Sequence, residues 1–144
     1  MAMNVQPIPS LDARINEIRL ATAEIVNKHV LPNETKLWAF RRGPDVDSNE
    51  RDEARALRKE IQAHVKKAGL WAPHLPTEYG GMGLDFLAHA YMNEVLAYSI
   101  GAASLFGVVA PNSGNQKILV KYGTEEQKKK WLMPLIEGTM QSGF

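Results

Sequence analysis

The fold is decided by two stretches of this chain, GLWAPHLPTEYGGMGLD (residues 69–85) and KYGTEEQKKKWLMPLIEG (residues 121–138). The first lacks hydrophobic periodicity and is rich in proline and glycine, which is typical of a long connection between regular elements. In the second, Thr124 and Gln127 have the spacing of a capping box, which starts a helix. The two stretches therefore predict helices on either side of an irregular connection.

Outside these stretches, apolar residues recur every three or four positions, as in amphipathic helices, and no segment alternates with period two. Ser10, Asp47 or Ser48, and Asp85 stand where helix N-caps are expected. Pro32 is expected to kink or end the first helix. We predict an all-α fold, a bundle of about six helices, over residues 11–29, 48–68, 86–97, 102–110, 112–121 and 125–137.

Two apolar segments and one polar segment complete this prediction. Residues 102–110 are apolar on every side, which favours a buried helix. Trp131 heads an apolar stripe in the last helix, which Gly138 should end. The polar residues 41–49 are rich in turn formers and predict an exposed loop.

Composition favours one domain of ordinary globular type. The 144 residues include 17 Lys and Arg against 16 Asp and Glu, so the charge is close to neutral and no nucleic-acid partner is expected. Cysteine is absent, which excludes disulfides and thiolate chemistry. The longest uncharged stretch, Val95–Gln116, contains glycines and a proline, so we expect no membrane span. The first residues lack a signal-peptide pattern, and a cytoplasmic location is expected.

Polar residues that carry chemistry elsewhere form no motif in this chain. The four histidines have no metal-ligand spacing, so no metal site is predicted. Glu94 is the one acid beside the uncharged centre, and a structural role with a Lys or Arg partner from another helix is preferred over catalysis. Residues 128–130 are three lysines that fit a solvated helix face.

The segments PTEYGGMGLD (residues 76–85) and YGTEEQKKKWLMPLIEG (residues 122–138) resemble, in order and separation, the N-terminal helical domain of the acyl-CoA dehydrogenases. The resemblance is strong over residues 69–144. APNSGN (residues 110–115) resembles a subgroup with a lengthened link between helices. Residues 1–144 are accordingly predicted to be that domain, with the middle β-domain and the C-terminal helical domain absent from the chain.

The resemblance implies a flavin enzyme when the other domains are present. Such enzymes bind FAD, oxidise an acyl-CoA to the trans-2-enoyl-CoA, pass electrons to an electron-transfer flavoprotein and form homo-oligomers. The catalytic base and the flavin contacts of the family would follow Phe144. No catalytic or cofactor-binding residue is therefore assigned, no FAD is expected on this chain, and the chain alone is expected to be inactive.

The resemblance also implies that the helix after Tyr98 supplies one wall of the acyl pocket. The matching substrate-binding residues are Ser104, Leu105, Val108 and Val109, spaced so that they would share one helical face. That face is expected to be exposed or to mediate self-association; the alternative is ordinary core. For the chain as a whole, the alternative function is a stand-alone helical interaction module without catalysis.

Overall fold

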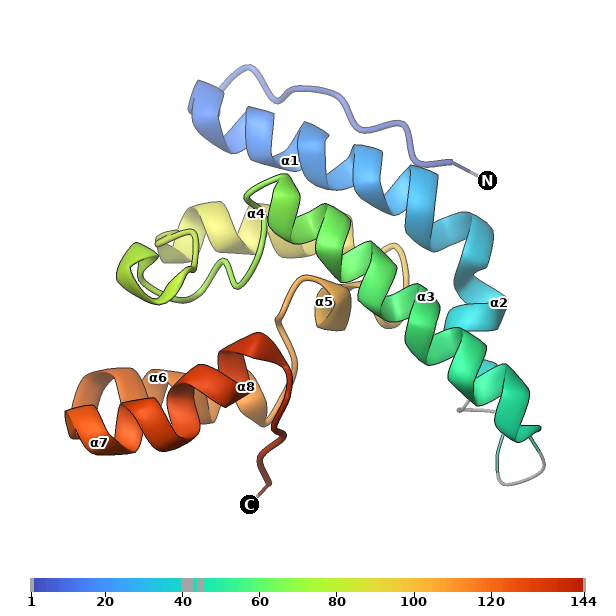
Figure 1. Cartoon of the computed structure of the whole chain (residues 1–144). Helices are drawn as coiled ribbons and strands as arrows, with labels where there is room; N and C mark the ends of the chain where they lie inside the picture. Colours follow the sequence, from blue (N-terminus) through green and yellow to red (C-terminus); the bar gives the residue numbers. More distant parts are fainter. Residues whose placement is uncertain (1, 40–42, 44–45, 144) are drawn as a thin grey trace.

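A computed structural model describes residues 2–39, 43 and 46–143, and all regular elements in these ranges are helical, with no strand. The predicted all-α fold is confirmed. In Figure 1, α1, α3 and α4 gather at one end, while α6, α7 and α8 form a hairpin at the other end. The helices are α1 (Ala13–Ile25), α2 (Glu34–Leu37), α3 (Ser48–Lys67), α4 (Phe86–Leu96), α5 (Ala102–Leu105), α6 (Asn112–Tyr122), α7 (Glu125–Gln127) and α8 (Met133–Glu137).

Most helix ends follow from local side-chain chemistry. Asp47 caps α3 and Asp85 caps α4, each accepting a hydrogen bond from a backbone N–H in the first turn, as predicted. Thr124 and Gln127 form the predicted capping box of α7. The prediction of Ser10 as the first N-cap is wrong, because Asp12 accepts the N–H of Arg14 at 2.8 Å and α1 begins at Ala13.

The helical segments are locally wound more loosely or more tightly at two places. α1 continues as a π-helical turn, Val26–Val30, and then as a 3₁₀ turn, Leu31–Asn33, that contains Pro32. Pro32, which was expected to kink or end the helix, lies in the 3₁₀ turn that ends it, so this prediction is confirmed. A second π-helical turn, Lys128–Leu132, joins α7 to α8. The loop predicted for residues 41–49 lies largely outside the described residues.

An extended N-terminal arm, residues 2–8, runs antiparallel to α1 and is held by two asparagines of that helical segment (Figure 1). The Asn27 side chain pairs with both the N–H and the carbonyl of Met3, at 2.7 and 2.9 Å. Asn16 pairs in the same way with Ile8, at 2.9 Å for both bonds. Each side-chain amide thus acts as the peptide group of a neighbouring strand would.

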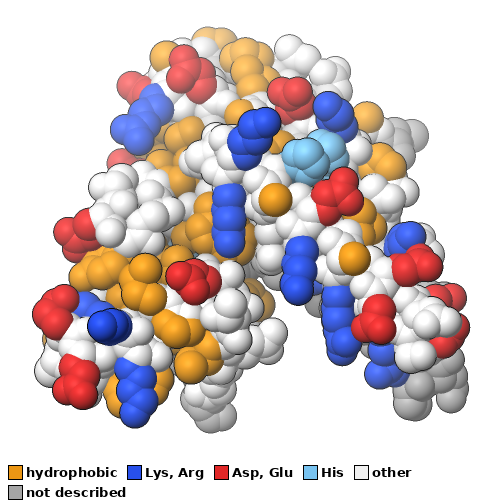
Figure 2. Space-filling view, in the orientation of Figure 1, with side chains coloured by type: hydrophobic (Ala, Val, Ile, Leu, Met, Phe, Trp, Pro, Cys, Tyr) orange, Lys and Arg blue, Asp and Glu red, His pale blue; other side chains and the backbone are white. Residues whose placement is uncertain are grey.

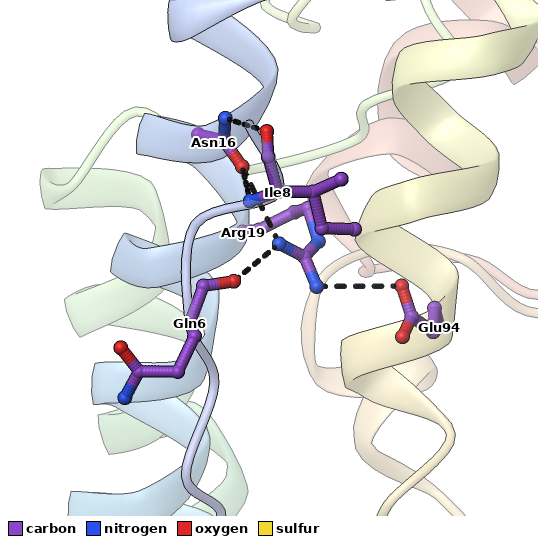
Figure 3. A network of polar contacts seen from close by, with 5 residues as sticks. All are labelled: Gln6, Ile8, Asn16, Arg19 and Glu94. Carbon is purple, nitrogen blue, oxygen red and sulfur yellow. Dashed lines mark hydrogen bonds and ion pairs between the residues drawn. The ribbon is translucent and has the colours of Figure 1, made fainter. Parts of the chain in front are cut away.

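Arg19 links the arm, α1 and α4 beneath this pairing (Figure 3). Its guanidinium donates to the Gln6 carbonyl at 2.9 Å and lies 3.6 Å from the Glu94 carboxylate. Arg19 is buried, whereas the Glu94 side chain is mostly exposed. The predicted basic partner of Glu94 from another helix is therefore confirmed, and the Glu94 side chain lies at the surface.

One hydrophobic core joins these elements, except α7, which contributes no residue to it. α1 packs on α4, α2 and α5 pack on α3, and α6 packs on the segment that ends in α8. The core includes Val26, Ile61, Met92, Phe106 and Leu132, none more than 1% exposed. No helix among the described residues is long and apolar enough to cross a membrane. On the face drawn in Figure 2, basic side chains lie next to acidic ones.

The Trp131 stripe is only partly as predicted. Leu132, Leu135 and Ile136 are buried, but Trp131 is 39% exposed and its ring lies under the Lys130 ammonium, 5.1 Å from the ring centroid. The π-helical turn departs from the 3.6-residue period on which the stripe was based. Gly138 ends the helix with φ of 82°, as predicted.

The connection between α3 and α4 is irregular as predicted, apart from one 3₁₀ turn, Thr77–Tyr79. It folds back on itself through backbone hydrogen bonds, among them Gly83 N–H to the Leu75 carbonyl at 2.8 Å. Gly81 lies so close to Leu75 that a Cβ on it would overlap the Leu75 carbonyl oxygen. The second glycine of the GG pair is therefore required by space.

Gly81→Ala should lower the free energy of unfolding by about 2 kcal/mol, because the obstacle is backbone and not the tip of a flexible side chain. Urea unfolding followed by circular dichroism measures the loss. Gly114→Ala is the matched control, because a Cβ on Gly114 meets open space within α6. It should stabilise the chain by less than about 1 kcal/mol. Equal effects of the two changes would contradict the close packing of the connection.

Candidate functional site

The segment that was expected to line a ligand pocket is not one helix. Only Ala102–Leu105 is helical, so the helix predicted over residues 102–110 is wrong beyond Leu105. Gly107 has φ of 80°, and a Cβ on it would lie 3.1 Å from the Trp71 ring. Glycine thus ends the helix by adopting a left-handed conformation against a bulky ring. Residues 106–111 form a link between α5 and α6.

The four predicted wall residues therefore do not share a helical face. Leu105 is fully buried in the core. Ser104 and Val109 line one cavity, and Val108 lines another. Val109, at 40%, is the one large apolar side chain among the four that is notably exposed. The link thus separates two cavities, and the expectation of a single exposed apolar face is wrong because the chain turns at Gly107.

The first cavity, which we call the Arg58 cavity, has a volume of about 180 Å³. Arg58 from α3 donates to the Ser104 hydroxyl at 3.0 Å, and that hydroxyl donates to the Gly101 carbonyl at 2.8 Å. The guanidinium also lies over the Trp38 ring, 5.1 Å from its centroid. The residues that line the Arg58 cavity come from α3, the connection, α5, the link, α6, α8 and the C-terminal tail. They are Arg58, Gln62, Trp71, Ala72, Ser104, Gly107, Val109, Ala110, Pro111, Asn112, Gln116, Leu135, Ile136, Gly138, Met140, Gln141 and Ser142.

The tail is held over the Arg58 cavity by the first turn of α6. The Asn112 carboxamide oxygen accepts the Ser142 N–H at 2.8 Å and the Ser142 hydroxyl at 2.9 Å. Asn115 donates to the same hydroxyl oxygen at 2.9 Å. Sequence reasoning assigned the segment of residues 110–115 only a lengthened link. Two asparagines in the first turn of a helix were the available signal, because amide side chains readily bond nearby backbone.

Gln116 connects the two cavities. It is buried, donates to the Leu135 carbonyl at 3.1 Å, and presents its oxygen to Nε2 of His74 at 2.8 Å. The Leu135 carbonyl can only accept, so it fixes which end of the Gln116 amide faces His74. His74 therefore carries its proton on Nε2.

The histidines, expected to be structural or solvated, stand in two pairs. The His29 and His64 rings stack at 4.4 Å, and the His74 and His89 rings lie 6.2 Å apart. Burial, followed by the charge of Lys117, lowers the pKa of His89. Burial also lowers the pKa of His74, although its bond to Gln116 opposes the change. Burial and the neighbouring His64 lower the pKa of His29. Among the described residues, no group of three or more potential ligands could hold a metal ion.

These three lowered pKa values predict that stability falls in mild acid. The unfolded chain takes up protons at the ordinary histidine pKa, while the folded chain resists protonation until lower pH. The free energy of unfolding should therefore be constant above a pH of about 7.5 and decrease towards about 5.5. Urea midpoints in buffer without sulfate or phosphate measure this. His89→Gln should flatten the slope, and an unchanged slope would contradict its lowered pKa.

The sequence model of the acyl-CoA dehydrogenase N-terminal domain matches residues 13–139. Acyl-CoA dehydrogenase family member 10 of Mus musculus is 33% identical over 139 residues, covering 93% of this chain and 12% of that protein. A probable acyl-CoA dehydrogenase of Mycobacterium tuberculosis, FadE2, is 29% identical, covering 94% and 32%.

Solved structures agree with these sequence matches. A putative acyl-CoA dehydrogenase from Mycobacterium abscessus superposes with a TM-score of 0.77 at 32% identity, covering 92% of this chain and 33% of that one. The chain thus spans a third or less of the length of these three relatives. Together with the helical fold and the two motifs, the matches show that this chain belongs to the acyl-CoA dehydrogenase family and carries its N-terminal domain.

Proposed function

We propose that this chain is the N-terminal domain of a flavin-dependent enzyme that oxidises acyl-CoA to trans-2-enoyl-CoA, and that its link supplies part of the acyl pocket. The observation that carries the proposal is the position of residues 104–109 between two cavities. Val108 and Val109 offer apolar surface to opposite sides of the link, while Leu105 anchors it in the core. Ser104, held by Arg58, fixes the start of the link.

FAD does not fit either of the two cavities beside the link. The two cavities beside the link each measure about 180 Å³, below the roughly 300–1,000 Å³ of typical small-molecule sites. In the Arg58 cavity, the polar side chains of Arg58 and Ser104 already form hydrogen bonds within the chain. In this proposal, flavin binding, the catalytic base and contact with an electron-transfer flavoprotein belong to the other parts of the enzyme. Homo-oligomer formation and a cytoplasmic location stay predictions.

The test uses methyl NMR of the 144-residue chain titrated with octanoyl-CoA. The Val108 and Val109 methyl signals should shift, because an alkyl chain contacts the apolar surface of the link. Coenzyme A without the acyl group should leave those signals in place. Val109→Lys should reduce the shifts, while Ile118→Lys, a matched change at an exposed position of α6, should not. Equal shifts with coenzyme A alone, or shifts centred on Ile118, would refute the assignment of the wall.

The purified chain should also be colourless and form no enoyl-CoA from octanoyl-CoA. The reason is that the two cavities beside the link are each smaller than a typical small-molecule site. An absorbance scan with a coupled activity assay measures both properties. Stoichiometric bound flavin would show that the chain holds a cofactor site of its own.

A helical interaction module is the second candidate, and one observation favours it. Four large apolar side chains are exposed at α4 and just beyond its end: Phe86, Leu87, Tyr98 and Ile100. Phe86 is 91% and Ile100 is 81% exposed, and a partner protein that covered either end of α4 would bury this apolar surface. Light scattering separates the candidates. Self-association that Ile100→Ser abolishes, without any response of Val108 or Val109 to octanoyl-CoA, would favour the module.

A further inference from the structure

A second cavity lies on the other side of the link and contains two histidines. We call it the His74 cavity; its volume is about 180 Å³ and it is open to solvent. It draws on the connection, α4, the link and α6. Its lining residues are His74, His89, Val108, Ser113, Gly114 and Lys117.

Both imidazoles bring a buried nitrogen without a partner to this region. Nδ1 of His74 and Nε2 of His89 are shielded from solvent and make no hydrogen bond with any described residue. Leaving a buried polar atom unpaired typically costs 1–3 kcal/mol. Two such atoms lie in rings that line one cavity, and a turn of either ring toward the cavity would let its free nitrogen bond a polar ligand there.

The tautomer of His74 determines whether its Nδ1 accepts or donates a hydrogen bond. Because Nε2 donates to the Gln116 oxygen, Nδ1 of the neutral ring is a bare acceptor. A second proton on Nδ1 would turn it into a donor without disturbing the bond to Gln116. An anion in the cavity would accept from that donor and would stabilise the added charge.

The charge around the cavity selects an anion over a metal cation. Lys117 is the one charged side chain among the described residues that line it, and its field reaches both imidazoles. A positive neighbour repels a metal ion and attracts an anion. The Ser113 hydroxyl, which now donates to the Val109 carbonyl at 3.2 Å, adds a further group able to donate.

We propose that the His74 cavity binds a small oxyanion of the sulfate or phosphate class, and that binding places protons on His74 and His89. Lys117 supplies the permanent charge, and the two imidazoles supply hydrogen bonds once they are protonated. Burial, followed by Lys117, lowers the pKa of His89, and burial lowers the pKa of His74, so the two rings take up protons as an anion binds here. The groups that face these rings are each other, Gln116 and Lys117.

The experiment is a sulfate titration of the 144-residue chain followed by the imidazole NMR signals at two pH values. Sulfate is chosen because its own charge is constant over the histidine range. Its affinity should rise as pH falls from about 7.5 to about 5.5, by up to roughly 10-fold per pH unit for each proton taken up. The His74 and His89 signals should move, and those of the remote His29 and His64 pair should not. Phosphate should compete with sulfate.

Two lysine variants on α6 make a matched control. Lys117→Gln should weaken sulfate binding at least 10-fold, while Lys121→Gln removes the same charge one turn away and should leave affinity within 2-fold. His89→Gln keeps a donor but cannot take up a proton, so it should reduce the pH dependence. Equal effects of the two lysine changes, or equal movement of all four histidines, would show non-specific anion association and overturn the proposal. A response of His74 and His89 to Zn²⁺ but not to sulfate would also overturn it.

Discussion

Phe106→Ala should lower the free energy of unfolding by about 4 kcal/mol, a large effect for one substitution. Phe106 is among the largest of the fully buried side chains, with no exposed surface. Its backbone also ties the link to the connection, since its carbonyl accepts the Ala72 N–H at 2.9 Å. The cavity left by the ring would lie where the two segments meet. Urea unfolding followed by far-UV circular dichroism measures the loss.

Phe86→Ala is the matched control for this prediction. The same side chain is removed, but from the exposed start of α4, so the free energy of unfolding should change by no more than about 0.5 kcal/mol. If the two alanine variants lost similar stability, the packing of the link on the core would be wrong.

Leu132→Ala should cost about 3 kcal/mol, more than the removal of its much larger neighbour Trp131. Leu132 is fully buried, whereas the Trp131 ring is partly exposed and lies under the Lys130 ammonium. Trp131→Ala should lower the free energy of unfolding by only about 1 kcal/mol, since the substitution mainly removes contacts of a partly exposed ring at the surface. Chemical denaturation of both variants compares them directly. A greater loss for Trp131→Ala would restore the stripe predicted from the sequence and contradict the π-helical turn.

Most features that depend on neighbouring residues were predictable from the sequence, and the N-cap of α1, predicted at Ser10 but found at Asp12, is the exception. The caps at Asp47 and Asp85, the capping box at Thr124 and the helix end at Gly138 each need only a side chain and backbone within about four residues. The two family motifs include the capping box at Thr124 and the helix end at Gly138. The helical fold could therefore be predicted from short segments of the sequence.

Features that depend on distant residues could not be predicted. Hydrophobic periodicity identified residues 102–110 as apolar but carried no signal that Trp71 packs against Gly107 and turns the chain. The pairing of His74 with His89 joins a connection to a helix, and spacing along the chain does not show it. Of the expected wall, Ser104 and Val109 come together at one cavity, but Val108 is placed at the other.

The pairing of the N-terminal arm with α1 has a consequence for the order in which the molecule opens. The arm is fastened at Met3 and Ile8, and the intervening Gln6 carbonyl is an acceptor for Arg19. If the arm detached from α1, water would reach the Arg19 guanidinium. Its hydration would offset part of the free energy lost with the hydrogen bond to the Gln6 carbonyl. Amide hydrogen exchange at Met3 and Ile8 should thus report a shared local fluctuation, faster than global unfolding. The contacts that hold the arm on α1 are thus expected to open before the rest of the fold.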